Sequence, residues 1–161
     1  MRVIGIKRDV SRREASNGGP AVDRIVTPDR FIEVAREADY IAVTAALTPQ
    51  TRGMVSAEIL AALKPSAWLI NIARGPIVDE VALVAALQAK RIGGAALDVF
   101  DTEPLPAASP LWALDNVILT PHVSNSSPRV RDRSLALVVD NVRRFKSGEP
   151  LRNLVDRAAG Y

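Results

Sequence analysis

The chain has 161 residues, of which 48% are hydrophobic and 24% charged, and this composition is typical of one domain with a packed core. It has no cysteine and one histidine, His122, so disulfides, thiolate metal sites and histidine-rich metal sites are excluded. The net charge of +3 and the aromatic content of 4% argue against nucleic-acid binding. No run approaches the roughly 18 apolar residues of a membrane helix, and no signal peptide opens the chain. We therefore expect a cytoplasmic protein.

Short apolar runs rich in Val, Ile and Leu recur along the chain. They lack polar alternation, which is typical of parallel strands buried on both faces of a sheet. The expected strands are Val3–Ile6, Tyr40–Val43, Trp68–Ile72, Ala95–Val99 and Val117–Leu119.

Helical patterns separate these runs. Capping residues predict helix starts at Thr27–Pro28, Ser56, Asp79–Glu80 and Ser127–Pro128. The last helix is the longest, has one apolar stripe and ends at Gly148. The stripe consists of Leu135, Val138, Val139, Val142 and Phe145.

Strands that alternate with helices predict an α/β fold with a doubly wound parallel sheet of the Rossmann type. In such sheets ligands bind at the carboxyl ends of the strands. Segments of unusual composition directly follow the predicted strands, at these carboxyl ends. They are Lys7–Arg8, Ala45–Thr48, Ala73–Gly75, Asp101–Pro104 and Thr120–His122.

Three of these residues form a candidate catalytic set. His122 is a natural proton donor and acceptor near neutral pH, and a carboxylate such as Glu103 beside it would orient the ring and raise its pKa. The guanidinium of Arg74 can hold a substrate carboxylate with two hydrogen bonds. Together they would suit reduction of a 2-oxoacid, provided that a cofactor delivers hydride.

Four ordered motifs make the chain resemble the NAD-binding domain of the D-isomer-specific 2-hydroxyacid dehydrogenases. They are Leu47–Met54, an arginine motif at Asn71–Glu80, a glutamate motif at Gly94–Phe100 with Glu103–Pro106, and a histidine motif at Asn116–His122. The pattern is most similar to the glyoxylate/hydroxypyruvate reductase type.

The resemblance implies roles for single residues. Arg74 would bind the substrate carboxylate, His122 would exchange a proton with the carbonyl oxygen, and Glu103 would pair with His122. Asp98 would lie near the nicotinamide carboxamide. Further cofactor contacts would come from Ala45, Ala46 and Thr51 on the adenosine side, from Ile72, Ala73 and Arg74 beneath the nicotinamide, and from His122 and Asn125. Asn125 stands where the family usually has a small residue.

Cofactor choice depends on the end of the first predicted strand. NAD enzymes place an acidic residue at this point to hold the ribose 2′-hydroxyl. Here Lys7–Arg8 could bind a 2′-phosphate instead, which favours NADP, while Asp9 keeps NAD open.

The glycine-rich phosphate loop of the family is absent from the sequence, because no G-x-G-x-x-G occurs. We expect residues 1–150 to form a partial dinucleotide-binding domain and residues 151–161 to be the crossover to an absent substrate domain. The strand that normally lies between Val3–Ile6 and Tyr40–Val43 is then missing. Either these two strands pair directly, or two chains associate to cover the gap.

Two functions remain open. The first is an NAD(P)-dependent oxidoreductase of small 2-oxoacids and D-2-hydroxyacids. The second is an inactive module that dimerises or binds a partner through its apolar helices. The family commonly dimerises through this domain, so we expect a homodimer in either case.

Overall fold

A computed structural model describes residues 1–8, 10 and 22–158 of the chain. The α/β architecture and the parallel strands confirm the expected Rossmann-type fold. Asp9, the residue that keeps NAD use open, lies outside the described residues.

The strands form two separate parallel sheets. Strands β1 (Ile4–Ile6) and β2 (Arg24–Val26) make the smaller sheet. The larger sheet contains β3 (Tyr40–Val43), β4 (Trp68–Asn71), β5 (Gly94–Leu97) and β6 (Val117–Leu119), in that order. Of the two expected alternatives, direct pairing of Val3–Ile6 with Tyr40–Val43 is therefore wrong, because β1 pairs only with β2 within the described residues.

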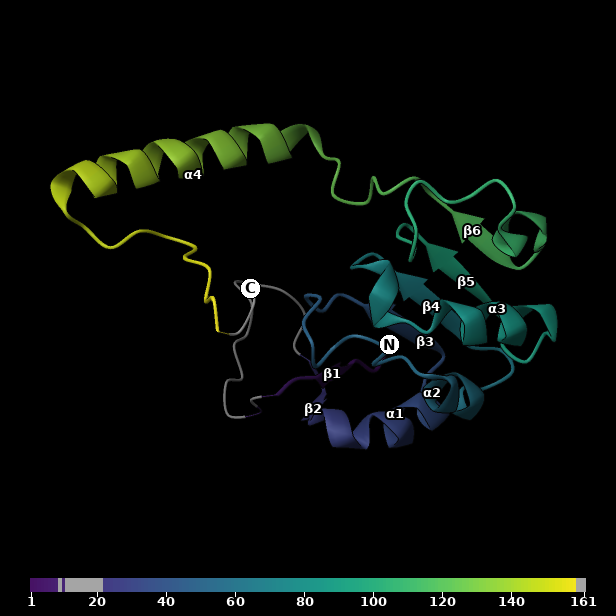
Figure 1. Cartoon of the computed structure of the whole chain (residues 1–161). Helices are drawn as coiled ribbons and strands as arrows, with labels where there is room; N and C mark the ends of the chain where they lie inside the picture. The colour runs from purple at the N-terminus through teal and green to yellow at the C-terminus, as the bar shows by residue number, and fades with distance from the viewer. Residues whose placement is uncertain (9, 11–21, 159–161) are drawn as a thin grey trace.

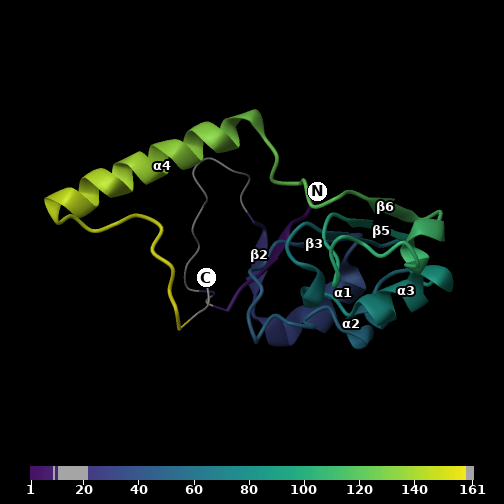
Figure 2. The same ribbon diagram turned by 45° about the horizontal axis from the view of Figure 1, so that its top comes forward.

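Three short helices cover one face of the larger sheet (Figures 1 and 2). Helix α1 (Phe31–Glu37) packs beside α2 (Ala57–Ala62), and α2 packs beside α3 (Glu80–Gln88). Short 3-10 turns at Pro28–Arg30, Gly75–Ile77 and Pro110–Ala113 complete this half of the chain. Their apolar side chains and alternate residues of the strands form the core, which includes Leu60, Leu69, Leu83 and Leu87.

The other face of the larger sheet is open in the described part of the chain. Cross-strand register places Ala42, Ile70, Ala96 and Ile118 in one row on that face. Ala42 and Ile118 are exposed, whereas Val43, Asn71 and Leu97 on the opposite face are buried. The expectation that the strands would be buried on both faces is therefore wrong, because no described helix crosses this side.

Helix α4 (Pro128–Ser147) projects away from the sheets (Figure 1). Ser127 accepts a hydrogen bond from the Arg129 amide at its start, and Gly148 ends it in the left-handed conformation, with φ 70°. The side chain of Asn141 exchanges two hydrogen bonds with the backbone of Arg152, so the chain turns back along the last turns of the helix. The apolar stripe of α4 is exposed along its length, with Phe145 77% exposed.

Candidate active site

The carboxyl ends of β3 to β6 bring the predicted site residues to one edge of the larger sheet. Each strand runs in the same direction, so the loops that follow them meet at the same end. Arg74 follows β4, Asp98 and Glu103 follow β5, and His122 follows β6.

Glu103 and His122 form a direct pair. The Oε2 atom of Glu103 lies 2.7 Å from Nδ1 of His122, and its Oε1 atom accepts a hydrogen bond from the Phe100 amide at 3.0 Å. These hydrogen bonds, from His122 first and from Phe100 second, hold the pKa of the Glu103 carboxyl below its usual value. The carboxylate is therefore ionised at neutral pH and orients the imidazole ring through its Nδ1 atom. The peptide bond between Glu103 and Pro104 is cis.

Arg74 lies close enough to contribute to the same electrostatic field. The positive charge of Arg74 also lowers the Glu103 pKa, but less than the two hydrogen bonds and the charge of His122 do. Its Nη1 atom donates to the carbonyl oxygen of Ala73 at 2.6 Å, and the residue is exposed. The exposed guanidinium therefore has remaining donors for an anionic ligand.

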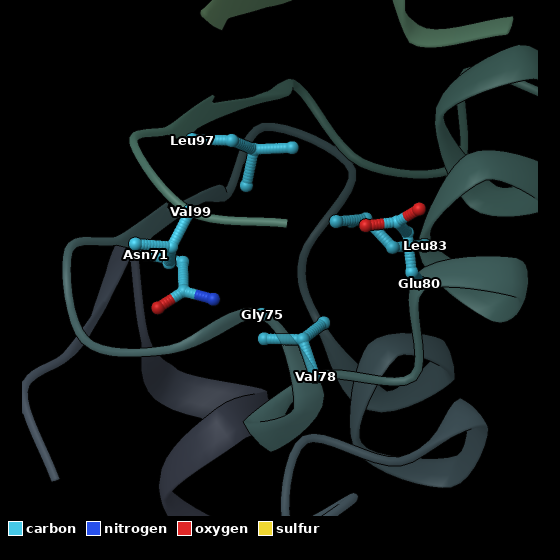
Figure 3. Close-up of a pocket in the computed structure, with 7 residues that line it drawn as sticks. All are labelled: Asn71, Gly75, Val78, Glu80, Leu83, Leu97 and Val99. Atoms are coloured by element: carbon cyan, nitrogen blue, oxygen red, sulfur yellow. The ribbon is translucent and has the colours of Figure 1, made fainter. Parts of the chain in front are cut away.

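Asn71 shapes the loop that carries Arg74. This buried side chain donates from Nδ2 to the Arg74 carbonyl oxygen and accepts from the Ala73 amide at Oδ1, both at 3.1 Å. It also lines a cavity of about 10 Å³ between β4, β5 and α3, shown in Figure 3. Such a cavity holds about one water molecule, so it is too small for a substrate. Apart from the place of Asn71 in the arginine motif, no pattern in the sequence points to this role.

Gly75 allows the Arg74 loop to approach the Glu103 loop. A Cβ atom at this position would lie 2.0 Å from the carbonyl carbon of Phe100, which is far inside van der Waals contact. Since the Phe100 amide itself bonds to Glu103, the glycine brings two parts of the candidate site together. Glu80 adds a second link, because its Oε2 atom accepts from the Asp101 amide at 3.0 Å.

Asp98 holds the loop on both sides of His122. Its Oδ1 atom accepts from Thr120 Oγ1 at 2.5 Å and from the Val123 amide at 2.9 Å, and its Oδ2 atom accepts from the Ser124 amide at 2.8 Å. Burial alone would raise the Asp98 pKa, but these hydrogen bonds outweigh it and hold the pKa well below its usual value. His122 lies within this clamp with φ 55°, a left-handed conformation that few non-glycine residues adopt.

The residues expected near the cofactor lie along the same edge of the larger sheet, apart from Lys7 and Arg8, which follow β1 in the smaller sheet. Thr51 folds its loop back by donating from Oγ1 to the Ala46 carbonyl oxygen at 2.7 Å, close to Ala45. Ile72 is 47% exposed at the end of β4 and can lie against a planar ring. Asn125 is exposed, beyond the Asp98 clamp.

These positions fit the two ends of a dinucleotide. The small residues Ala45 and Ala46 leave space above β3, and the exposed Ile72 offers an apolar surface above β4. The fit does not extend to the pyrophosphate, because the glycine-rich loop that would donate backbone hydrogen bonds to it is not in the sequence.

None of the described helices is long and apolar enough to cross a membrane.

Known proteins share this fold and these motifs. Residues 1–124 match the family described as D-isomer specific 2-hydroxyacid dehydrogenase, NAD binding domain. Glyoxylate/hydroxypyruvate reductase B of Yersinia pestis is 46% identical over 120 residues, which are 74% of this chain and 37% of the reductase. An uncharacterised protein of Corynebacterium melassecola is 43% identical over 86% of this chain and 46% of its own length. The chain thus spans less than half the length of these curated relatives.

Two solved structures are similar to this chain over 99% of its length. A D-isomer specific 2-hydroxyacid dehydrogenase from Xanthobacter autotrophicus Py2, solved with NADPH and MES, is 40% identical with a TM-score of 0.86, over 99% of this chain and 62% of that one. An NADPH-dependent glyoxylate/hydroxypyruvate reductase from Sinorhizobium meliloti, solved with NADP and sulfate, is 33% identical with a TM-score of 0.84, over 99% and 49%. The chain belongs to the D-isomer specific 2-hydroxyacid dehydrogenases, and its residues 1–124 match their NAD-binding domain.

Proposed function

We propose that this chain is the nucleotide-binding and catalytic half of an NAD(P)-dependent oxidoreductase that interconverts a small 2-oxoacid and a D-2-hydroxyacid. The observation that carries the proposal is the Glu103–His122 pair, 2.7 Å apart, on the same sheet edge as the exposed Arg74. The division into a partial dinucleotide-binding domain at 1–150 and a crossover remnant at 151–161 is part of this proposal.

His122 is the proposed proton donor in reduction and acceptor in oxidation. Its Nδ1 atom faces Glu103, so Nε2 is the nitrogen that is available to a substrate oxygen. The ionised Glu103 stabilises the protonated imidazole and orients it. Arg74 binds the substrate carboxylate and so places the carbonyl oxygen next to Nε2. A nicotinamide cofactor, when bound, supplies the hydride that the carbonyl carbon receives.

The cofactor is proposed to be NADP in preference to NAD. Lys7 and Arg8 follow β1, where a 2′-phosphate would need positive charge. The two solved relatives described above contain NADPH and NADP. Ala45, Ala46 and Thr51 are proposed to line the adenosine side, and Ile72, Ala73 and Asp98 the nicotinamide side, with Asn125 at its margin.

Oxidation of NADPH with glyoxylate or hydroxypyruvate, followed by absorbance, tests the activity. The chain is assayed alone and as a chimera in which it replaces its counterpart in the Yersinia reductase, which restores the segments that the chain lacks. We expect turnover in the chimera, a loss of at least about a hundredfold in His122→Ala, and a smaller loss in Glu103→Gln. A folded chimera that is inactive, or whose His122→Ala variant keeps full activity, would refute the assignment.

The same assay measures cofactor choice. Arg8→Ala should raise the KM for NADPH several-fold and leave the KM for NADH nearly unchanged, since only NADPH carries the 2′-phosphate. Arg91→Ala is the matched control, because Arg91 is an exposed arginine between α3 and the start of β5, at the edge of the sheet opposite the carboxyl ends of the strands. An equal effect of Arg8→Ala on both cofactors would contradict NADP preference.

A second candidate function is an inactive module that dimerises or binds a partner. The exposed apolar stripe of α4 favours it, because a soluble helix seldom leaves such a stripe uncovered. A cytoplasmic homodimer is our proposal under both candidate functions.

A further inference from the structure

Glu80 lies outside the candidate catalytic set, but it bonds to the loop that carries Glu103. It is the first residue of α3, directly after the N-cap Asp79, and its side chain is half-buried. Its Oε2 atom accepts a hydrogen bond from the Asp101 amide at 3.0 Å. A carboxylate that accepts from a backbone amide makes one of the stronger hydrogen bonds in proteins. Glu80 therefore anchors the chain two residues before Glu103.

The peptide group between Phe100 and Asp101 is held from two sides. Its N–H donates to Glu80, and Gly75 lies against it. A Cβ atom on Gly75 would lie 2.0 Å from the Phe100 carbonyl carbon, 2.1 Å from its oxygen and 2.5 Å from the Asp101 nitrogen. Gly75 and Glu80 also border the same small cavity (Figure 3). The close contact and the hydrogen bond together fix the plane of this peptide group.

The Phe100 amide connects this anchor to the candidate catalytic pair. It donates to Oε1 of Glu103 at 3.0 Å, and Oε2 of Glu103 lies 2.7 Å from Nδ1 of His122. The direction of the Phe100 amide depends on the two backbone dihedrals of Phe100, which the fixed peptide group after it restricts. The Phe100 side chain is buried, so the residue has little freedom to turn. Glu80 thus acts on the orientation of Glu103 through the Phe100 backbone.

A simpler role of Glu80 would be to stabilise the start of α3. Acidic residues are favoured in the first turn of a helix, where they face the positive end of the helix dipole. The same role would apply to Glu58, an exposed residue in the first turn of α2. The hydrogen bond to Asp101 is what distinguishes Glu80 from Glu58.

We propose that Glu80 is a positioning residue, which holds the Glu103 carboxylate against His122 through the Phe100–Asp101 peptide group. Its importance for turnover rests on the proposed reaction, whereas its effect on the place of Glu103 does not.

Two variants of Glu80 separate the hydrogen bond from the charge. Glu80→Gln keeps an oxygen acceptor at the same reach and removes the negative charge. Glu80→Asp keeps the charge at the start of α3, but its side chain is shorter by one carbon–carbon bond of about 1.5 Å, so it loses the Asp101 amide. Glu80→Ala removes both. Glu58→Ala is the matched control, because it removes a first-turn charge from the exposed start of α2.

Residue-resolved hydrogen exchange by NMR, on the chain without cofactor or substrate, measures the bond between Phe100 and Glu103. In Glu80→Asp and Glu80→Ala the Phe100 amide should exchange at least about fivefold faster, while the amides of β4 stay within about twofold of the unchanged chain. In Glu80→Gln and Glu58→Ala the Phe100 amide should also stay within about twofold.

The titration of Glu103, followed by NMR at its carboxyl carbon, is a second measurement. The hydrogen bond from His122 first and that from Phe100 second hold the pKa of this carboxyl below its usual value, and the charges of His122 and Arg74 lower it further. Glu80→Asp weakens the Phe100 bond and leaves His122 and Arg74 in place. The pKa of Glu103 should therefore rise in Glu80→Asp and should not rise in Glu80→Gln.

The chimera with the Yersinia reductase relates this positioning to turnover. Glu80→Asp should lower kcat for NADPH oxidation about three- to tenfold and leave the KM for NADPH within about twofold, and Glu80→Gln should recover most of the loss. An inactive chimera would refute the proposed reaction, whereas the exchange and titration results would still decide whether Glu80 holds Glu103.

Five results would overturn the proposal. They are unchanged Phe100 exchange and Glu103 pKa in Glu80→Asp, equal effects of Glu80→Gln and Glu80→Asp, faster Phe100 exchange in Glu58→Ala, an active chimera whose kcat is unchanged in Glu80→Asp, and exchange of the β4 amides that Glu80→Asp speeds as much as that of Phe100. The last result would show that the bond stabilises the whole fold and not one loop. If Glu80→Ala does not fold, Glu80→Asp decides the question, because it keeps the charge at the start of α3.

Discussion

Asp98 shows how one buried carboxylate can position a candidate catalytic side chain. It bonds to Thr120 on one side of His122 and to Val123 and Ser124 on the other, and so holds His122 in its left-handed conformation. A conformation of this kind costs about 1–3 kcal/mol and persists only where neighbouring contacts enforce it. The resemblance to the family suggested a cofactor contact for Asp98, whereas its three hydrogen bonds indicate a positioning residue as well.

Replacement of Asp98 by Asn should change the acid stability of the chain. The folded-state pKa is depressed, so between that value and the ordinary pKa near 4 the unfolded chain binds a proton that the folded chain does not. The stabilisation by Asp98 is therefore complete above about pH 4 and is lost as the pH falls through the folded-state pKa.

Urea unfolding at several pH values measures this effect. In Asp98→Asn the free energy of unfolding should be lower at pH 7 and should fall less steeply between about pH 4 and pH 2. Asp29→Asn, at an exposed position before α1, is the control and should keep the slope of the unchanged chain. Parallel curves for Asp98→Asn and the unchanged chain would contradict the clamp.

Gly75 is the closest contact between the two loops of the candidate site. Gly75→Ala forces a methyl group against the Phe100 backbone and should lower the free energy of unfolding by at least about 1–3 kcal/mol. Gly5→Ala is the matched control, because its Cβ atom would meet only side chains, the nearest at 3.3 Å, and should cost less than about 0.5 kcal/mol. Equal stability of the two variants in urea unfolding would show that the loops can separate freely.

At the residue scale, the sequence could predict which side chains share an edge but not how they are held. The places of Arg74, Glu103 and His122 after separate strands follow from the order of elements alone. The contact of Gly75 with Phe100 depends on the approach of two loops about 25 residues apart in the chain. No local pattern in the sequence records such an approach.

The predicted N-caps differ in whether their side chains make the expected hydrogen bond. Ser56 accepts from the Ile59 amide and Asp79 accepts from the Ala82 amide, as expected of N-caps. Thr27 makes no side-chain cap hydrogen bond, and a 3-10 turn at Pro28–Arg30 precedes α1. The expected start at Thr27–Pro28 is therefore confirmed in position, with Thr27 as N-cap of a 3-10 turn that leads into α1, but Thr27 does not cap it through its side chain.

Alanine substitution of the caps should reproduce this difference. Asp79→Ala removes a bond of 2.9 Å and should cost about 1 kcal/mol of stability. Thr27→Ala removes no cap bond and should cost less than about 0.5 kcal/mol. Both values come from urea unfolding, and an equal cost at the two positions would contradict the assignment of caps.

Strand lengths explain what periodicity detected and what it missed. The expected strands Tyr40–Val43 and Val117–Leu119 agree with β3 and β6. The expected strand Trp68–Ile72 ends one residue earlier in β4, and the expected strand Ala95–Val99 begins one residue and ends two residues earlier in β5. Strand β2 was not expected at all. It has three residues and begins with Arg24, too short and too polar at its start for an apolar run to stand out.

At the scale of the whole molecule, α4 is the largest element outside the core. Its apolar stripe, Leu135, Val138, Val139, Val142 and Phe145, is exposed, which supports the proposed homodimer. If α4 forms the dimer contact, the double variant Leu135→Glu and Phe145→Glu should sediment as a monomer at concentrations where the unchanged chain is dimeric. Val130→Glu, nearer the start of the helix, is the control. A dimer that survives the double substitution would place the contact elsewhere.

The sequence predicted that a strand would be missing between β1 and β3, but not the response of the fold. In the structure β1 pairs with β2 and β3 pairs with β4, and no described strand joins the two sheets. Periodicity describes one element at a time, so it could not show which neighbour each strand would choose.

The separation of the sheets has a consequence for the chain in concentrated solution. Within the described residues β1 pairs only with β2 and β3 pairs only with β4, so each of these strands has one unpaired edge. An unpaired edge can form backbone hydrogen bonds with a strand of another copy, and a contact between two unlike edges does not close on itself. Aggregation that grows with concentration is therefore the characteristic failure expected of this fold.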